Sequence, residues 1–214
     1  EIFSRLLPAE YLRRSPESFV GLAAYGGSLA WDLSEEARNN FVGDGGQLLR
    51  ATSGKKHWRT SERGGMLAAG VGGPMLGFGY GLGLVDDPTD PEKAASPTYQ
   101  SRYEHWWESK WMSRQEPGAA IVVTMQRLGS QDPIDYLFRR EVGEDTDEDP
   151  QNWHVVVCDE IRSDAAYGRW DGPNGLPPTC TIEPDHRKVG MILGPSRFSQ
   201  SQVDAKHRSQ SATV

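Results

Sequence analysis

Short apolar runs alternate with helical patterns over the first two thirds of the chain. Three nearly continuous apolar runs have strand length and the pattern typical of strands buried on both faces, at residues 19–25, 82–85 and 119–123. Helical patterns precede, separate and follow these runs, at residues 1–14, 28–41, 98–112 and 133–140. The alternation predicts an α/β fold with a mostly parallel sheet flanked by helices.

The helices expected at 28–41 and 98–112 carry further detail. Ser28 is the expected N-cap of the first. In the second, aromatic residues recur every four positions, at Tyr99, Tyr103, Trp107 and Trp111. Such a face could stack on nucleotide bases, but aromatic residues at helical spacing more often pack a helix onto its sheet. We assign these four residues to the core and leave Trp106 without an assignment.

The remaining sequence is less regular. Short apolar segments between Gly, Ser and Lys clusters at 43–70 predict hairpin strands or an edge excursion. Residues 141–150 hold six acidic residues in ten and predict a solvated loop. One more strand is expected at 153–157, before Gly- and Pro-rich sequence and a polar end. We expect a main domain at 1–140, then the acidic loop, then an irregular appendage at 151–214.

Composition narrows the class of protein. The chain has 214 residues and a net charge of −7, and it contains no apolar run of the ~18 to 20 residues that cross a bilayer. Cys158 and Cys180 form no disulfide scaffold, and the five histidines form no zinc pattern, so we expect a cytoplasmic protein in which oxygen atoms would hold any metal. The net charge argues against a surface that binds DNA everywhere, although it can hide a local basic patch.

Two adjacent carboxylates follow the second apolar run. Residues 82–85 lead directly into Asp86, Asp87 and Pro88, and the proline prevents simple continuation of a strand. An apolar strand that ends in two acids is the Walker B arrangement, in which one carboxylate holds Mg²⁺ and its neighbour orients or deprotonates the attacking water. Asp86 is therefore the candidate metal ligand and Asp87 the candidate catalytic base.

Two other interpretations of these acids stay open. An Asp-Asp-Pro turn is a common way to end a strand and to bond its own backbone. Residues 155–157 also lead toward an acidic pair, Asp159 and Glu160. A helix and a further strand follow Asp87, whereas Gly- and Pro-rich sequence follows Glu160. Because a nucleotide-binding sheet holds its ligand at strand C-termini, we favour Asp86 and Asp87.

Polar groups follow the third apolar run. In a parallel sheet, the side chains of Thr124, Gln126 and Arg127 would lie at the same edge as Asp86, where they could sense a γ-phosphate. The alternative is that Thr124 and Gln126 bond loop backbone while Arg127 pairs with an acid such as Asp132. Both interpretations stay open at this point.

The chain contains no Walker A motif. Residues 70–83 hold seven glycines, but they spell neither GxGxxG nor GxxxxGK[ST], so they predict a flexible turn with close backbone packing. Residues 52–56 contain a Gly-Lys pair without the earlier glycine or the following Ser or Thr of a phosphate-binding loop.

In order along the chain, these segments resemble the ATPase part of the large terminase subunits of tailed bacteriophages. Residues 70–79 and 83–88 are similar to the family's glycine segment and Walker B motif, and residues 120–128 resemble its coupling motif. Residues 1–12 resemble the helix just after the family's Walker A, and residues 19–30 resemble the next strand and turn. By this resemblance the phosphate-binding loop would precede residue 1.

Further matches accompany two departures. Two residue pairs match in order, Trp106 with Trp107 and Ser113 with Arg114. Residues 193–198 resemble the approach to the family's RNase H-like nuclease domain, whose carboxylates would follow Val214. Phe78 and Gly129 stand where some relatives carry Arg and His, so neither an arginine finger nor a histidine role transfers to them.

The resemblance implies a P-loop NTPase fold without its P-loop strand, belonging to a motor that hydrolyses ATP with Mg²⁺ and moves double-stranded DNA into a procapsid. It implies a homo-oligomeric ring, a portal protein and a small terminase subunit as partners, no membrane, and the cytoplasm of a bacterial host. Asp86 would hold the metal and Asp87 would act on water, while Thr124, Gln126 and Arg127 would respond to the phosphate state.

Loss of the P-loop strand is expected to leave an unpaired strand edge or a hole in the sheet. Without the P-loop lysine, we expect little or no ATPase activity from these 214 residues. Two functions of other classes stay open. One is a non-catalytic DNA-binding or assembly fragment with salt-dependent duplex binding; the other is a Mg²⁺-dependent nuclease that uses Asp86 and Asp87 and ignores ATP.

Overall fold

The computed structural model contains two compact units. It describes residues 2–75, 77–129, 131–142, 150–162 and 176–211. The units are Glu1–Tyr136 and Leu137–Val214, and helix α4 (Pro133–Glu141) crosses the division, a few residues before the boundary expected at 140. No helix within the described ranges is long and apolar enough to cross a membrane.

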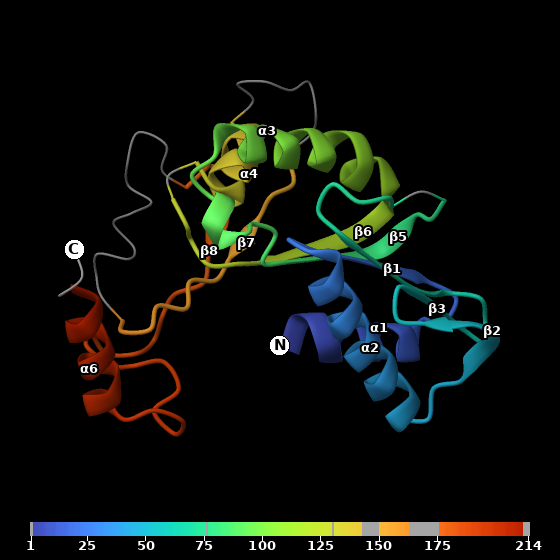
Figure 1. Cartoon of the computed structure of the whole chain (residues 1–214), viewed down its shortest axis with the longest axis horizontal. Helices are drawn as coiled ribbons and strands as arrows, with labels where there is room; N and C mark the ends of the chain where they lie inside the picture. Colours follow the sequence, from blue (N-terminus) through green and yellow to red (C-terminus); the bar gives the residue numbers. More distant parts are fainter. Residues whose placement is uncertain (1, 76, 130, 143–149, 163–175, 212–214) are drawn as a thin grey trace. The chain divides into compact units, whose positions relative to one another are not determined.

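A six-stranded sheet forms the centre of the first unit (Figure 1). Its strands, in spatial order, are β2 (Leu48–Gly54), β3 (His57–Thr60), β4 (Gly65–Gly70), β1 (Phe19–Ala24), β5 (Tyr80–Asp86) and β6 (Gln115–Thr124). The four strands from β4 to β6 are parallel, whereas β3 is antiparallel to β4, and β2 is antiparallel to β3. The prediction of an α/β fold with a mostly parallel sheet is confirmed.

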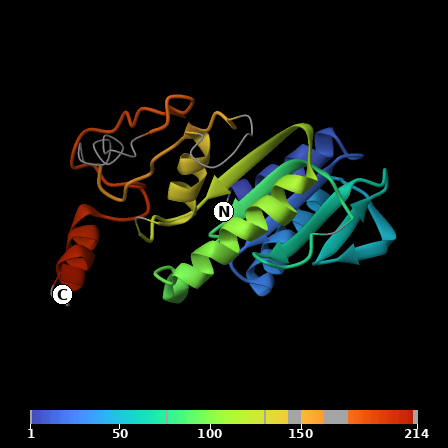
Figure 2. The same ribbon diagram turned by 90° about the horizontal axis from the view of Figure 1, so that it is seen from above.

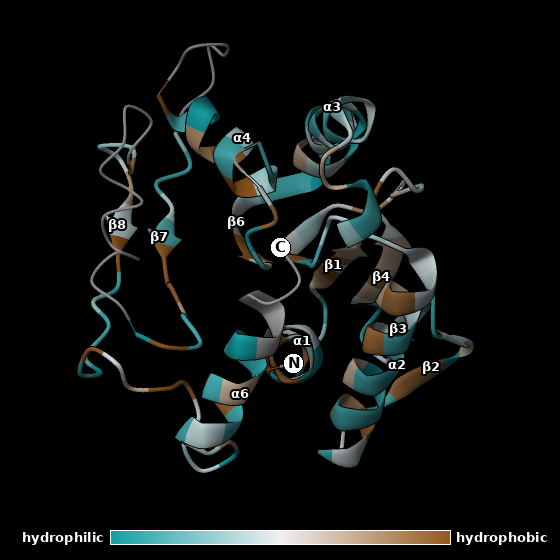
Figure 3. Ribbon diagram, turned by 60° about the vertical axis from the view of Figure 1, so that its left-hand side comes forward, coloured by the Kyte–Doolittle hydropathy of each residue, from teal (hydrophilic) through white to brown (hydrophobic). Residues whose placement is uncertain are grey.

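Helices cover both faces of this sheet (Figure 1). The elements η1 (Ile2–Leu6), α1 (Leu7–Arg14) and α2 (Gly27–Gly43) lie on one face. Their apolar residues share a core with alternate residues of the strands, including Leu12, Leu33, Leu22, Leu84, Phe41, Met66 and Trp58. Figure 3 shows the hydrophobic residues concentrated in strands such as β1 and β4. This burial is the main source of stability, since a fully buried Leu contributes about 1.5 to 3 kcal/mol.

The opposite face carries α3 (Pro97–Trp106), the π-helical turn η3 (Trp107–Trp111) and the short η4 (Met112–Arg114), which follow the short η2 (Pro91–Lys93). Figure 2 shows α3 lying across the strands. Of the four aromatic residues predicted for the core, Tyr103, Trp107 and Trp111 are buried and Tyr99 is half-buried. Trp106 is buried as well. The ring of Trp111 packs 4.8 Å from that of Tyr80.

The hairpin strands expected at 43–70 are present, since β2 pairs antiparallel with β3, and β3 pairs antiparallel with β4. β4 also pairs in parallel with β1 and so lies inside the sheet, which was not expected. Two local expectations need correction. The run at 119–123 lies in β6 but is only partly buried, because β6 is the last strand of the sheet and has a neighbour on one side only among the described strands. Gly26, not Ser28, is the N-cap of α2, and no side chain bonds that helix end.

The described residues of the second unit form little regular structure. The strand expected at 153–157 is reduced to β7 (His154–Val155), which pairs in parallel with β8 (Thr181–Ile182). Buried Glu141 organises this region, since its carboxylate accepts hydrogen bonds from the backbone of Gln151 and Asn152 and from the hydroxyl of Thr179. The polar end forms a helix, α6 (Gln200–Ser211), that the sequence pattern did not predict.

Two further expectations concern the same unit. Cys158 and Cys180 are free thiols, as expected from their spacing. Most of the acidic loop at 141–150 lies outside the described residues.

Candidate functional site

The connections of β1 and β5 diverge at their carboxyl ends. β1 continues through α2 toward β4 on one side, whereas β5, its direct neighbour, continues through α3 to β6 on the other side. In open α/β sheets, ligands bind in the crevice outside the carboxyl ends of strands where the connections part in this way. Asp86 is the last residue of β5 and pairs with Ala24 at the end of β1, so the candidate acids lie at this point.

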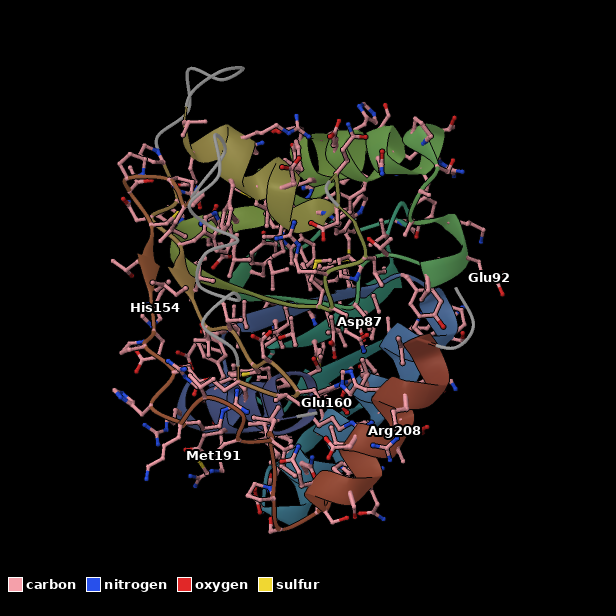
Figure 4. The ribbon with its side chains drawn as sticks, turned by 90° about the vertical axis from the view of Figure 1, so that its left-hand side faces the viewer. Asp87, Glu92, His154, Glu160, Met191 and Arg208 are labelled. Carbon is pink, nitrogen blue, oxygen red and sulfur yellow. The ribbon has the colours of Figure 1, made fainter. Side chains whose placement is uncertain are left out.

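The backbone of Asp87 joins three strands at this edge. Its N–H donates to the carbonyl of Thr124 at the end of β6 (2.8 Å), and its carbonyl accepts from the N–H of Tyr25 just after β1 (3.0 Å). Asp87 has a φ of 42°, in the left-handed region that is uncommon for residues other than glycine. The two hydrogen bonds hold this conformation, which turns the chain sharply at Asp87, labelled in Figure 4.

Burial and neighbouring groups shift the pKa of the Asp87 carboxylate. Partial burial of the Asp87 carboxylate raises its pKa, and the neighbouring charge of Asp86 raises it further. A hydrogen bond from the backbone N–H of Gln126 lowers the pKa of Asp87 and opposes these two effects. Since Asp87 as a residue is exposed, water moderates the whole shift. A carboxyl group with a raised pKa at a strand end is suited to accept a proton.

Thr124 and Gln126 lie next to the acids, as the parallel arrangement predicted. Thr124 is paired in register with Asp86 across β5 and β6, and it is half-buried. Gln126 is exposed, and its backbone N–H lowers the pKa of the Asp87 carboxylate. A movement of the loop after β6 would therefore change the surroundings of Asp87, the candidate base.

Arg127 is engaged by an acid, which is one of the two interpretations that its sequence context allowed. Its Nε lies 2.5 Å from Oδ2 of Asp132, whose side chain is almost completely buried. The other oxygen of Asp132 accepts hydrogen bonds from the backbone of Ile134 and Asp135 and so caps α4. A phosphate-sensing role for Arg127 thus requires its guanidinium to reorient or to bind in addition to Asp132.

The second acidic pair has a different setting. β7 ends at Val155, so Asp159 and Glu160 are not at the tip of a strand. Glu160, labelled in Figure 4, pairs instead with Lys206 (2.9 Å) and lies 3.1 Å from His207 of α6. Its pKa is lowered, mainly by the hydrogen bond from Lys206. This pair therefore joins two segments of the second unit and has no place at a sheet edge.

The glycine segment begins at the same sheet edge as the acids, at the end of β4. A Cβ added at Gly70 would lie 2.8 Å from the backbone nitrogen of Gly27, so the end of β4 approaches the start of α2 this closely only because Gly70 lacks a side chain. Gly72 has a φ of 84°, and its carbonyl accepts a hydrogen bond from Lys110 (3.0 Å). These contacts fit the predicted turn with close backbone packing.

Asp86 and Asp87 would supply the carboxylate oxygens for the metal site that the sequence predicted. Within the described ranges no three or more His, Cys, Asp or Glu residues gather as a metal site. Mg²⁺ in nucleotide-binding sites is commonly held by one or two carboxylates together with substrate phosphates. Asp86 and Asp87 fit that limited requirement because they are adjacent, reachable by solvent and placed at the strand ends.

Two residues contribute to this edge in ways that the sequence analysis did not identify. Tyr25 supplies a backbone N–H, which any residue could provide. Asp132 could be recognised only as a possible partner of Arg127; its role as a helix cap follows from the Asp-Pro that begins α4.

Comparison with known proteins identifies no family. No protein-family model matches the chain, and no curated protein matches it significantly.

Proposed function

We propose that this chain is the Walker B part of an ATPase of the phage large-terminase type, which moves double-stranded DNA into a procapsid. One observation carries the proposal: two adjacent carboxylates lie at the carboxyl end of a buried parallel strand, at the point where the connections of neighbouring strands diverge. The P-loop NTPase class, the ring and the partners named from the sequence remain part of this proposal.

In the proposed reaction the residues of this edge have separate tasks. Asp86 would hold Mg²⁺, and the bound metal would neutralise charge on the nucleotide phosphates. Asp87, whose pKa is raised, would orient the attacking water and accept its proton. Gln126 and Thr124 would link the state of the site to the loop after β6, through their backbone contacts with Asp87.

The open side of β6 supports the proposal further. Ile121, Val122 and Val123 are half-buried although they form an apolar run, as expected for a strand that has a neighbour on one side only among the described strands. The sheet has two outer strands, β2 and β6, and only β6 ends beside Asp86. A strand that carries a phosphate-binding loop could therefore pair with β6 and bring its loop to the acids.

The sequence that precedes Glu1 in the gene provides the simplest test. The proposal expects a Gly-x-x-x-x-Gly-Lys-Ser or Gly-Lys-Thr motif shortly before residue 1. A stop codon, or an unrelated domain without such a motif, would exclude the ATPase.

A biochemical test compares two acidic positions in protein that includes those upstream residues. Asp86→Asn should lower the kcat of Mg·ATP hydrolysis by about 100-fold or more, because an electrostatic contribution made in the transition state is lost. Asp159→Asn is the matched control, since it removes one carboxylate from the second acidic pair, Asp159 and Glu160, and should leave kcat unchanged. Unchanged hydrolysis in Asp86→Asn, or loss of hydrolysis in Asp159→Asn, would remove the site assignment.

The same variant, Asp86→Asn, also distinguishes the other two functions when DNA cleavage and DNA binding are measured. A two-carboxylate nuclease would cut duplex DNA with Mg²⁺ and without ATP, and Asp86→Asn would abolish the cutting. A non-catalytic DNA-binding fragment would bind duplex in a salt-dependent manner, with no effect of nucleotide and no effect of Asp86→Asn.

A further inference from the structure

The β2–β3 ribbon is basic within an acidic chain. We use this name for residues 47–63, which include both strands and the turn after them. The segment contains five basic residues, Arg50, Lys55, Lys56, Arg59 and Arg63. Its one acidic residue is Glu62, whereas the whole chain carries a net charge of −7. The ribbon thus concentrates positive charge that the net charge conceals.

The ribbon lies at the outer side of the sheet and is poorly covered (Figure 1). Of the seven residues of β2, only Leu48 and Thr52 are half-buried, and the other five are exposed. A strand that served only to close a core would bury every second side chain. Most of β2 is therefore accessible to a partner, although Leu48 packs against the core.

Two of the basic side chains, those of Lys56 and Arg59, lie against aromatic rings and form no ion pair with a carboxylate among the described residues. The Lys56 ammonium lies 4.1 Å from the centroid of the Trp31 ring. The Arg59 guanidinium lies 5.3 Å from the ring of Phe19 and 5.7 Å from that of Phe78. Such cation–π contacts orient a side chain and leave its charge in place.

The charges of the other basic residues are also accessible. Lys55 forms an ion pair with Asp32 (2.9 Å), but both side chains are exposed, so the pair is weak. Arg50 and Arg63 are exposed, and no carboxylate pairs with either of them among the described residues. Charge on an edge strand can also serve to prevent strand pairing between molecules. That explanation does not cover Arg59 on the inner strand β3 or Arg63 in the turn after it.

We propose that the β2–β3 ribbon binds the phosphate backbone of duplex DNA. β3 also pairs with β4, so the ribbon cannot enter a groove as a free pair of strands; it would lie against the outside of the duplex, where its exposed basic groups would meet phosphates. Arginine and lysine contacts to phosphate release counterions, which drives binding without base specificity. The choice of duplex DNA over other polyanions rests on the proposed packaging function.

Salt-dependent binding of this 214-residue chain to a duplex of arbitrary sequence tests the inference. The double variant Arg50→Gln/Arg63→Gln should bind more weakly, and the slope of log K against log salt concentration should fall by about 1.8, since each lost phosphate contact accounts for about 0.9. The single variant Arg50→Gln should lower the slope by about 0.9 and provides the result if the double variant does not fold.

The matched control removes two exposed arginines elsewhere. Arg13 and Arg14 lie on α1, where both pair with Glu10, so Arg13→Gln/Arg14→Gln changes the net charge equally. This control should keep the wild-type slope. Equal slopes in the two double variants, or no duplex binding by the wild-type chain, would overturn the inference. Self-association that depends on the ribbon, without duplex binding, would also overturn it and indicate an acidic protein surface as the partner.

The outcome is separable from that of the proposed ATPase, because duplex binding is measured here without nucleotide. Loss of hydrolysis in Asp86→Asn together with ribbon-independent DNA binding would retain the ATPase and reject the ribbon. The reverse pattern would retain the ribbon and reject the ATPase.

Discussion

β5 and β6 are neighbouring strands with similar apolar sequences and different environments. Leu84 and Val85 of β5 are buried, whereas their partners in register, Val122 and Val123 of β6, are half-buried. β5 has a strand on each side, and β6 has one on a single side among the described residues. Asp86, the candidate metal ligand, therefore lies on a strand that is buried and paired on both sides. The groups that contact Asp87, the candidate base, lie on or just after a strand that is half-buried and paired on one side. A carboxylate on a well-packed strand, next to a loop that can move more easily, is expected when a site must both hold a ligand and respond to it.

Amide hydrogen exchange should show the largest difference between the two strands. Amides of β5 should exchange only on global unfolding, with protection of at least about 5 kcal/mol. Successive N–H groups of a strand point to opposite sides, so every second amide of β6 points to the open side and should exchange almost as fast as in an unfolded chain. Exchange detected by NMR at single residues measures both sets.

The upstream residues provide the control for this measurement. In protein that includes them, a strand paired with β6 should protect its outward amides to a degree close to that of β5. If those amides stay unprotected while the upstream residues are folded, the proposed position of the P-loop strand is wrong. Full protection of the β6 amides in the 214-residue chain would show that β6 has no open side and does not differ from β5 in this respect.

Matched truncations should show a smaller difference of the same sign. Leu84→Ala removes a fully buried side chain and should lower the free energy of unfolding by about 3 kcal/mol. Val122→Ala, at the position paired with Leu84, removes a half-buried side chain and should cost about 1 kcal/mol. Denaturant titrations of the two variants measure both losses. Equal losses would mean that β6 is as well packed as β5.

The apolar runs predicted β1, β5 and β6 because buried parallel strands leave few polar positions. They could not distinguish a central strand from an outer one, since the difference arises from pairing between distant segments. β4 (Gly65–Gly70) was expected as a hairpin strand, but its parallel pairing with β1 was not expected, because that pairing joins segments far apart in the sequence. α6 was missed because its residues are polar on all sides and show no helical period.

The candidate site could be predicted in part. The order strand, acids, helix, strand placed Asp86 and Thr124 at one edge, and the structure pairs them. The left-handed backbone of Asp87 could not be predicted, because it depends on a hydrogen bond to Thr124 at the end of β6 and on one from Tyr25 just after β1. Asp132 was named from the sequence as one possible partner of Arg127, and the structure shows that it also caps α4.

The smallest expected effect tests the contact between the end of β5 and the loop after β6. Burial and the charge of Asp86 raise the pKa of Asp87 above its ordinary value, so the folded state favours the protonated form. The corresponding contribution to stability is fully present below the unfolded pKa and is lost as the pH rises through the folded pKa. Asp87→Asn stays neutral, so it should be slightly more stable than the wild type at neutral pH and equally stable in acid.

Asp90→Asn is the control of opposite sign for this pH dependence. The hydrogen bond from Lys93 lowers the pKa of Asp90, so its contribution is present above the unfolded pKa and is lost as the pH falls through the folded pKa. This variant should be slightly less stable than the wild type at neutral pH. Thermal melts across acid and neutral pH measure both differences. If Asp87→Asn loses stability at neutral pH, the hydrogen bond from Gln126 outweighs burial and the charge of Asp86, and Asp87 is then held as a fixed carboxylate rather than prepared to accept a proton.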